Sequence, residues 1–287
     1  MTNRRNFLRT TAAFAAGAMA FPMAACGESK SKKVIGLQLY TVRDKISADQ
    51  EATLEKLSRI GYNSLEAAGY NMNDRTFYGM EPKAFANHVR GLGMPLHSSH
   101  TVYELDNADV VCEDAAKAGV EYIIYPYLPD NLRTNLDDYR ATAEKFNRMG
   151  EIAQKHGLKF GYHNHAFEFE EMDGEIPMDL LIGQTDPKLV TFELDLYWIS
   201  RGGCDAVDYF KKYPGRFELW HVKDMVTSDD QFFAPVGRGR IDFERIFAEK
   251  ETAGMKYFFV EQDSFRELDP FESVEISLNY LKEAKFV

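Results

Sequence analysis

The chain has 287 residues and a formal net charge of −11 at pH 7, with 45% hydrophobic and 28% charged residues. These values are typical of a folded globular protein and exclude a disordered chain, a collagen and a polytopic membrane protein. Three cysteines are too few for a disulfide scaffold. The acidic balance argues against a nucleic-acid partner, because an acidic surface repels phosphate backbones.

Residues 1–26 have the features of a bacterial export signal. Arg4 and Arg5 precede a mildly apolar run of about 12 residues, which is too short to span a membrane. The run ends at Met23-Ala24-Ala25-Cys26, which resembles a lipobox. We therefore predict twin-arginine export, a periplasmic location and a lipid anchor on Cys26 as the only membrane contact, followed by a polar tether at residues 27–33. The alternative is an apolar helix that carries an arginine pair by chance.

From residue 34 onward, short β-rich runs alternate with longer segments of helical spacing. The predicted strands are residues 34–40, 62–67, 94–100, 121–125, 159–163, 190–195, 217–222 and 257–262. The predicted helices are residues 48–60, 82–92, 109–118, 136–156, 205–213, 243–253 and 270–283. Glycines that follow several of these helices are predicted helix stops, namely Gly61, Gly93, Gly119, Gly157, Gly215 and Gly254.

This alternation predicts an α/β protein with a single (β/α)8 barrel over residues 34–287. A doubly wound open sheet would show the same alternation and is the alternative. The count of eight strands favours the barrel. So does the sequence Tyr40-Thr41-Val42-Arg43-Asp44 after the first strand, where a dinucleotide fold would have a glycine-rich turn. Cys112 and Cys204 fall in helical patterns and are predicted to be unbridged.

Side chains that bind metals gather at the predicted ends of the strands, where barrel enzymes have their active sites. Five of the seven histidines stand there, namely His97, His100, His163, His165 and His221, whereas His88 and His156 fall on helices. Acidic residues stand at the same ends, namely Glu66, Glu168, Glu193, Asp195, Asp224, Glu261 and Asp263. One such side chain is usually a hydrogen-bonded structural group, so only their convergence indicates a function.

Convergence of buried carboxylates and imidazoles predicts one divalent metal ion, because these groups are costly to bury unless a cation or a proton neutralises them. Oxygen and nitrogen ligands without thiolate suit Mn²⁺, Mg²⁺, Co²⁺ or Zn²⁺. Mn²⁺ is the expected ion, since it suits an oxygen-rich site that also binds substrate oxygens.

Four segments of the chain stand out as motifs, namely GLQLYTVRD at residues 36–44, GYHNHAFEF at 161–169, ELDLYW at 193–198 and WHVKD at 220–224. Together they resemble the xylose isomerase-like barrel family, which includes sugar phosphate isomerases/epimerases, inosose dehydratases, ketose epimerases and family-two apurinic endonucleases. The resemblance covers essentially all of residues 34–287. It is more specific for the fold than for the reaction, and the acidic composition disfavours the endonuclease branch.

The resemblance implies a metal ion held by a Glu, an Asp, a His and a Glu from strands five to eight. Asp195, His221 and Glu261 match the last three positions residue for residue. Strand five departs from the family pattern, because His163 stands at the ligand position and Glu168 lies five residues further on. Either His163 is the fourth ligand or Glu168 folds back to the metal, and we expect His163. In ketose epimerases the strand-five and strand-eight glutamates form the acid/base pair, so this departure bears on mechanism.

The expected chemistry is removal of a proton next to a carbonyl group of a sugar or keto-sugar, through a metal-stabilised enediolate. Glu261 is the expected base, with His165 or Glu168 as its partner on the other face. Lys223 or His100 is expected to assist the oxyanion. The expected substrate-binding residues are Glu66, His100, Trp198 and Tyr40, although the two aromatic residues are equally consistent with packing at the rim.

An isomerase or epimerase of small carbohydrates is the primary prediction. A 3-keto-glycoside lyase or hydratase is an alternative, since the same enolate can expel the group at the anomeric carbon. A non-catalytic sugar-binding lipoprotein is a second alternative. Export and acidity favour a neutral sugar over a sugar phosphate. Arg238 and Arg240 could hold an anion, but loop arginines of this kind more often brace the barrel rim.

Overall fold

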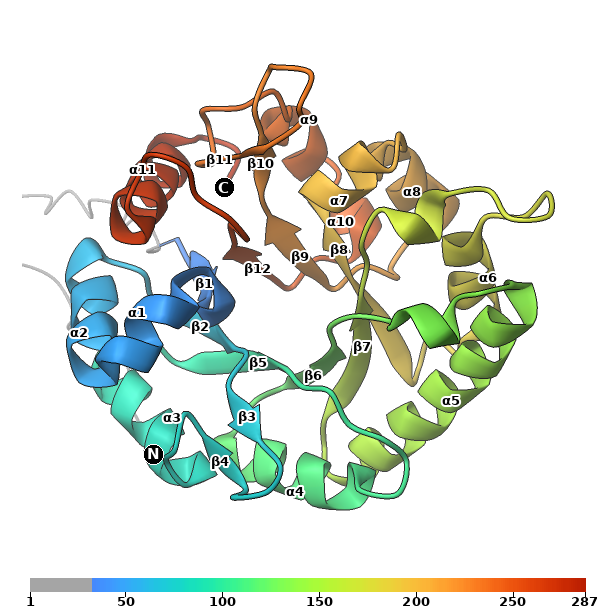
Figure 1. The fold of residues 1–287 in the computed structure, drawn as a ribbon, viewed down its shortest axis with the longest axis horizontal. Coiled ribbons are helices and arrows are strands. Elements are labelled where there is room, and N and C mark those ends of the chain that lie inside the picture. The colour runs from blue at the N-terminus through green and yellow to red at the C-terminus, as the bar shows by residue number, and fades with distance from the viewer. Residues whose placement is uncertain (1–32) are drawn as a thin grey trace, which may run out of the picture. The chain divides into compact units, whose positions relative to one another are not determined.

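The computed structural model describes residues 33–287, and the predicted export signal and Cys26 lie outside the described residues. Eight parallel strands close into a barrel in the order β1-β12-β9-β8-β7-β6-β5-β2, with helices around the outside (Figure 1). The barrel strands are β1 (Gly36–Gln38), β2 (Ser64–Ala67), β5 (Leu96–His100), β6 (Tyr122–Tyr125), β7 (Lys159–His163), β8 (Val190–Asp195), β9 (Leu219–Val222) and β12 (Tyr257–Val260). The predicted (β/α)8 barrel is therefore confirmed.

The helices have amphipathic sequences and pack their apolar sides on the strands. They are α1 (Arg43–Ala48), α2 (Gln50–Ile60), α3 (Pro82–Gly91), α4 (Ala108–Ala118), α5 (Leu136–Lys155), α6 (Pro177–Gln184), α7 (Leu196–Arg201), α8 (Ala206–Lys212), α9 (Phe243–Phe247), α10 (Lys250–Ala253) and α11 (Pro270–Glu283). All six glycines that the sequence predicts as helix stops have positive φ angles, a backbone conformation in which glycine carries no steric penalty.

Local capping explains where the helices differ from the prediction. The predicted helix 48–60 begins two residues later, at Gln50, because the Asp49 side chain accepts a hydrogen bond from Ala52 N at 3.0 Å and caps α2, while Ala48 ends α1, which the sequence did not predict. The predicted helix 243–253 is divided into α9 and α10. The sequence prediction did not include α6, α7 or the two short hairpins, β3 (Tyr70–Asn71) with β4 (Thr76–Phe77) and β10 (Asp224–Met225) with β11 (Phe233–Ala234).

The lower part of the barrel interior is closed by a small apolar cluster of Tyr122, Ile124, Leu219 and Phe259. Gly36 leaves room for the Phe259 ring, since a Cβ atom at Gly36 would lie 2.3 Å from Phe259 Cδ1. The main core lies between the strands and the helices. The floor is therefore packed, and polar side chains occupy the barrel only above it, toward the carboxyl ends of the strands.

The two described cysteines and the helices bear on the predictions of unbridged cysteines and of a chain that is not a polytopic membrane protein. Cys112 is buried and Cys204 half-buried, and both are free, as predicted. Among residues 33–287, no helix has the length and apolar character needed to cross a bilayer.

Candidate metal centre and active site

Strand alternation places the polar residues of the site. Side chains two residues apart on a strand point to the same face, so Glu193 and Asp195 on β8 both point into the barrel. His221 on β9 faces inward in the same way, two residues above Leu219 of the apolar floor. The interior therefore has a deeper and an upper polar layer above the apolar floor.

The upper layer brings together four residues that the sequence predicts as metal ligands. His163, Asp195, His221 and Glu261 are all buried, and one potential ligand atom of each lies within 4.8 Å of the others. His163 Nε2 lies 3.1 Å from Asp195 Oδ2, and His221 Nδ1 lies 2.8 Å from Glu261 Oε2. We call these four residues the upper cluster.

The hydrogen bonds of His163 leave a lone pair facing the upper cluster. Its Nδ1 lies 3.1 Å from the carbonyl oxygen of Pro126, which only accepts hydrogen bonds, so Nδ1 carries the hydrogen. Burial and the nearby positive charges of His221, His100 and Lys223 hold the pKa of His163 well below its usual value. The neutral ring therefore turns an unprotonated Nε2 toward the Asp195 carboxylate. Lys223 contacts the same Asp195 oxygen, but among the described residues no donor reaches His163 Nε2, and a cation between Nε2 and Oδ2 would satisfy both atoms, so the site fits a metal ion.

His221 is oriented in a comparable way by Glu66. His221 Nε2 donates to Glu66 Oε2 at 2.6 Å, which leaves Nδ1 for the upper cluster. Burial disfavours the charged ring, but the carboxylates of Glu193, Glu261 and Glu66 outweigh it and raise the pKa of His221 well above its usual value. A metal-binding histidine commonly donates its other N–H to a carboxylate or a backbone carbonyl, and both His163 and His221 show this pattern.

Lys223 supplies positive charge at the upper cluster. Its Nζ lies 2.9 Å from Asp195 Oδ2, 2.5 Å from Glu261 Oε2 and 3.0 Å from Asp263 Oδ1. Burial opposes the charge of Lys223, but these carboxylates raise its pKa well above the ordinary value. Burial raises the pKa of Asp263 to about 6, against the lowering effect of Lys223. Asp263 has no predicted role in the sequence, although its position two residues after Glu261 predicts that it shares the same face.

The two carboxylate oxygens of Asp195 have different partners: one caps a helix and the other faces the upper cluster. Oδ1 accepts hydrogen bonds from Tyr197 N and Trp198 N, both at 2.9 Å, and so caps the first turn of α7. Oδ2 faces His163 and Lys223. The helix that follows β8 thus fixes the carboxylate, and one oxygen stays free of backbone partners.

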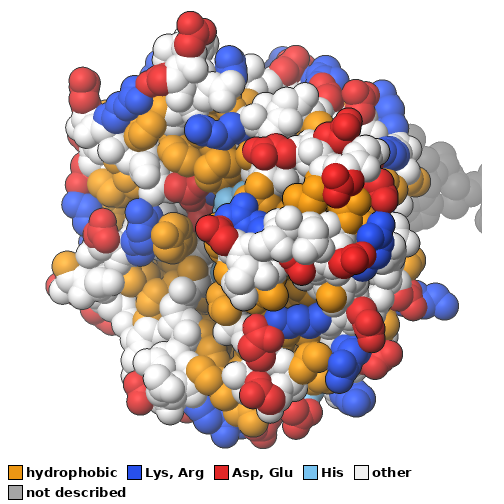
Figure 2. All heavy atoms as spheres, turned by 45° about the vertical axis from the view of Figure 1, so that its right-hand side comes forward, with side chains coloured by type: hydrophobic (Ala, Val, Ile, Leu, Met, Phe, Trp, Pro, Cys, Tyr) orange, Lys and Arg blue, Asp and Glu red, His pale blue; other side chains and the backbone are white. Residues whose placement is uncertain are grey.

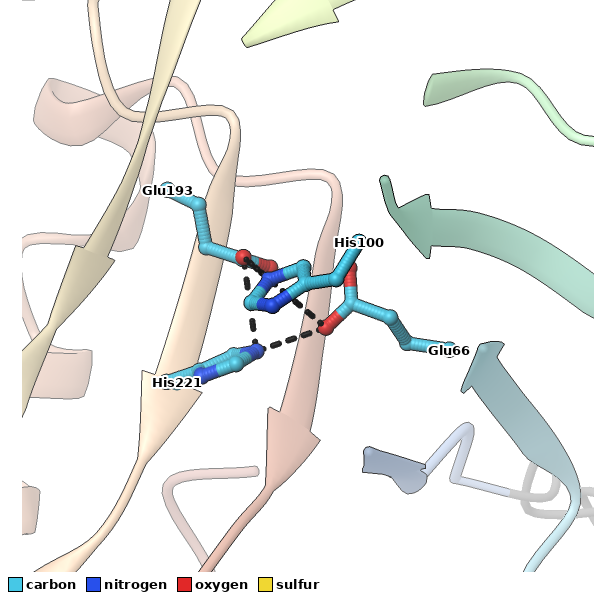
Figure 3. A group of neighbouring side chains, drawn as sticks. All are labelled: Glu66, His100, Glu193 and His221. Atoms are coloured by element: carbon cyan, nitrogen blue, oxygen red, sulfur yellow. Dashed lines mark hydrogen bonds and ion pairs between the residues drawn. The ribbon is translucent and has the colours of Figure 1, made fainter. Parts of the chain in front are cut away.

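The deeper layer is a second cluster of Glu66, His100, Glu193 and His221 (Figure 3). His100 Nε2 lies 2.5 Å from Glu193 Oε2, and His221 Nε2 lies 3.3 Å from the same oxygen. Burial and the charge of Glu66 raise the pKa of Glu193 to about 7. Each imidazole here already has a carboxylate partner, His100 with Glu193 and His221 with Glu66, so hydrogen bonds satisfy this cluster without a metal ion. Glu193 has no predicted role in the sequence, although its spacing of two from Asp195 places it on the same face.

The expectation that Glu66 binds substrate is not supported by its position. Glu66 is fully buried and does not line the cavity above the upper cluster. Its oxygens accept hydrogen bonds from Gln38 Nε2 at 2.8 Å, Ser98 Oγ at 2.6 Å and His221 Nε2. Glu66 therefore contacts His221 at Nε2, the ring nitrogen that does not face Glu261, and does not border the cavity.

We expect the Glu66→Gln variant to bind Mn²⁺ about 10- to 100-fold more weakly than the wild-type protein. A neutral amide accepts the His221 N–H less strongly and makes the ring a poorer ligand. Titration calorimetry with Mn²⁺ measures this effect, and the exposed Glu283→Gln is a control for loss of one negative charge. Equal affinities in the wild-type protein and both variants would show that Glu66 does not act through His221.

A cavity of about 560 Å³ opens above the upper cluster at the carboxyl ends of the strands. Figure 2 shows the hollow on one face of the molecule, with histidine inside it and hydrophobic side chains beside it. Seven of the sequence-predicted site residues line the cavity, namely Tyr40, His100, His163, His165, Trp198, Lys223 and Glu261. Asp195 and His221 lie beneath its surface.

Glu168 does not reach the upper cluster, which corrects its expected role as acid/base partner. It follows β7 in a short turn, and its carboxylate accepts hydrogen bonds from Tyr162 OH and from His165 N at 2.8 Å. Tyr162 packs against Phe146 of α5, outside the barrel. Because Tyr162 and His163 are adjacent on a strand, they point to opposite faces, and Glu168 follows Tyr162 away from the metal-ligand candidates. The choice between His163 and Glu168 at the cluster thus favours His163.

Glu168 makes a pH-dependent contribution to stability. Burial raises the pKa of Glu168 from 4.5 to about 7. The folded state therefore holds its proton more tightly than the unfolded chain, so this contribution is full below pH 4.5 and is lost as the pH rises to about 7. Relative to the wild-type protein, Glu168→Gln should gain about 3 kcal/mol of unfolding free energy between pH 4 and pH 8. Urea unfolding at both pH values measures this, with the exposed Glu171→Gln as control. Parallel stability curves for wild type and Glu168→Gln would contradict it.

Two further sequence expectations are resolved by position. His97 is wrongly expected at the mouth: it is the second residue of β5, at the opposite end of the barrel, where it stacks on Tyr257 at 4.3 Å and contacts Glu121. The backbone of the loop that carries Arg238 and Arg240 binds a carboxylate of the protein itself, that of Asp224, instead of an anionic ligand. The Asp224 carboxylate accepts hydrogen bonds from Gly237 N, Gly239 N and Ile241 N at 2.9–3.1 Å.

The fold and the upper cluster together define a (β/α)8 barrel whose mouth can hold a divalent metal ion. A sequence profile described as "Xylose isomerase-like TIM barrel" matches residues 54–284, and the chain belongs to this family. The resemblance seen in the sequence is thereby confirmed.

Similar proteins include sugar phosphate isomerases/epimerases of known structure and inosose dehydratases. A sugar phosphate isomerase/epimerase from Parabacteroides distasonis, of known crystal structure, is 31% identical with a TM-score of 0.80, over 92% of this chain and 99% of that one. A second such structure from the same organism is 28% identical with a TM-score of 0.79, over 88% and 99%. An inosose dehydratase from Clostridium perfringens is 29% identical over 167 residues, which are 52% of this chain. The match spans about half of that relative, 56% of its length.

Proposed function

We propose that this protein is a divalent-metal-dependent enzyme that removes the proton next to the carbonyl group of a keto-sugar. The observation that carries the proposal is the upper cluster: two imidazoles, each held from behind by a hydrogen-bond acceptor, turn their inner nitrogens toward two carboxylates. His163, Asp195, His221 and Glu261 would hold the ion, and Mn²⁺ suits this donor set. When bound, the ion acts as a Lewis acid that stabilises negative charge on substrate oxygens.

Glu261 is the proposed base, because it borders both the upper cluster and the cavity. Burial opposes its ionisation, but Lys223, His221 and His163 outweigh this and hold the pKa of Glu261 well below its usual value. It is therefore a carboxylate at neutral pH and is ready to accept a proton. The Lys223 ammonium, 2.5 Å away, lies where it can stabilise the oxyanion that develops on the substrate.

Elimination is the reaction that this arrangement supports best. An epimerase must return a proton to the opposite face of the carbon, and β7 offers only histidines for that task. Burial above all, together with the charge of Lys223, lowers the pKa of His165 to about 2, so His165 is a neutral ring and a poor acid. A lyase instead needs one base and an acid for the leaving group. His100 lines the cavity, and Glu66 and Glu193 outweigh burial to raise its pKa, so it can supply that proton. The dehydratase relatives support this choice.

Isomerisation is the second candidate reaction. It needs the same proton removal, and the solved relatives that match nearly the whole chain are described as sugar phosphate isomerases/epimerases. We also propose that the protein is exported and anchored through Cys26, and fractionation of the native cells with and without Arg4 and Arg5 replaced by lysine tests this.

Proton exchange in deuterated water tests the proposed function. With Mn²⁺ and a panel of keto-sugars, nuclear magnetic resonance should show loss of the proton next to the carbonyl, and a chelator should stop it. An unsaturated product identifies a lyase, and an isomeric sugar identifies an isomerase. Sugar binding without any exchange would identify a binding protein and contradict the proposal.

A further inference from the structure

The mouth of the barrel has two chemically different halves. Strands β7, β8, β9 and β12 are consecutive in the barrel and carry the upper cluster, Lys223 and Asp263. Strands β6, β5, β2 and β1 are consecutive on the other side. The cavity lining on this side contains His100 and Thr101 and is otherwise mainly apolar, with Tyr40, Ala68, Tyr70, Val102, Pro126 and Tyr127. We call these six residues the apolar wall.

Exposure distinguishes the apolar wall from ordinary packing. Among the described residues, five large hydrophobic side chains are exposed, and three of them belong to the wall: Tyr40 at 44%, Val102 at 66% and Tyr127 at 40%. Single exposed apolar residues are common, but a group of them beside a cavity indicates a binding surface. Hydrophobic side chains beside the hollow are visible in Figure 2.

Three hydroxyl groups on this side already have protein partners. Tyr70 OH donates to Asp114 Oδ2 at 2.8 Å, and Tyr127 OH accepts from Arg133 at 2.7 Å. Thr101 Oγ1 is paired with Ser99 Oγ at 3.0 Å. A second sugar ring would need several free hydrogen-bond partners here, whereas an apolar group needs none. The wall therefore favours an apolar ligand over a polar one.

The charged side chains that line the cavity disfavour a phosphate group on the ligand. Among residues 33–287, Lys223 is the only Lys or Arg that lines the cavity, and it is already paired with three carboxylates. A phosphate is normally held by free cationic donors, and here it would face Glu261 and Asp263 instead.

We propose that the substrate is an uncharged glycoside whose apolar, planar aglycone lies on the apolar wall while its sugar ring lies over the upper cluster. This inference rests on the proposed function, because it takes the upper cluster as the place of the sugar. The cavity of about 560 Å³ agrees with it, since cavities of this size hold drug-sized ligands, which are larger than one sugar ring.

Binding of unreactive glycosides tests the proposal without turnover. Phenyl glucoside, methyl glucoside, cellobiose and glucose 6-phosphate lack the keto group, and each is titrated calorimetrically into the full-length protein with Mn²⁺. We expect phenyl glucoside to bind about 10-fold more tightly than methyl glucoside, in keeping with burial of one face of the ring. Equal binding of the two glucosides would overturn the proposal. Tightest binding of cellobiose would assign the wall to a second sugar, and tightest binding of glucose 6-phosphate would assign the cavity to a phosphate.

Matched variants locate the effect on the wall. Val102→Ser should reduce the preference for phenyl over methyl glucoside about threefold or more, because Val102 is largely exposed and its loss leaves the core intact. Val34→Ser and Leu268→Ser remove exposed apolar side chains that do not line the cavity and should leave the preference unchanged. The same effect in all three variants would overturn the proposal.

The two proposals fail in different ways. Mn²⁺ binding and proton exchange on a keto-sugar without a preference for phenyl glucoside would overturn the aglycone site alone. A preference for phenyl glucoside that needs an intact wall, in a protein without proton exchange, would overturn the proposed reaction and leave the wall as a binding site.

Discussion

Replacing Asp195 with asparagine is expected to weaken Mn²⁺ binding at least about 100-fold while leaving the protein folded. The two oxygens of Asp195 have separate tasks, so the substitution separates them. The amide oxygen can still accept from Tyr197 N and Trp198 N and cap α7. The amide nitrogen replaces Oδ2 and can donate to His163 Nε2, which supplies the proton that the pair lacks without a cation. The substitution also removes the ion pair between Oδ2 and Lys223, so gain and loss offset each other and the unfolding free energy of the metal-free protein should stay close to the wild-type value.

Calorimetric titration with Mn²⁺, together with urea unfolding of the metal-free protein, measures both parts of this prediction. Asp229→Asn is the matched control, because Asp229 is exposed and lies in the loop between β10 and β11. If Asp195→Asn bound Mn²⁺ as tightly as the wild type, the carboxylate would not be a ligand. If it lost stability instead, the role of Asp195 would be structural.

Replacing Glu261 with glutamine is expected to lower kcat about 1,000-fold at saturating Mn²⁺. The amide keeps an oxygen for the upper cluster but cannot accept the substrate proton. Because the substitution acts on the chemical step, the KM for the keto-sugar should change far less than kcat. Exchange of the substrate proton in deuterated water should fall by the same factor as kcat.

Glu267→Gln is the control for Glu261→Gln, since Glu267 is an exposed residue of the same loop. A fall in Mn²⁺ affinity that fully accounts for the lost rate would make Glu261 a ligand only. In that case Asp263, whose pKa lies at about 6 and which also lines the cavity, would be the next candidate for the base.

Much of the fold follows from local rules that the sequence displays. The residues of β8 are buried on both faces, as expected for a parallel strand covered by helices, and its predicted bounds agree with the structure. The helix stops are equally local, because Gly61 or Gly119 takes a left-handed conformation wherever its helix ends. The convergence of His163, Asp195, His221 and Glu261 followed from strand order and from the family resemblance.

Other features depend on contacts that the sequence does not display. Glu168 lies only five residues after His163, but the turn between them directs it to Tyr162, and only the packing of α5 shows where Tyr162 points. His97 is misplaced because the sequence prediction assigns the whole run from His97 to His100 to the end of the strand, whereas only His100 ends β5 and His97 is its second residue. Glu66 stands at the expected strand end, yet its depth relative to His221 depends on the stagger of strands in the closed barrel.

The most direct measurement is the metal content and Mn²⁺ stoichiometry of the full-length protein. Elemental analysis after purification without chelator, followed by titration of the stripped protein, should give one ion per chain in the wild type and none retained by Asp195→Asn. A wild-type protein that takes up no divalent ion would contradict the account, because the facing lone pairs of His163 and Asp195 would then be stable without a cation. Two ions per chain would contradict it as well, since the deeper cluster would then bind metal instead of orienting His221.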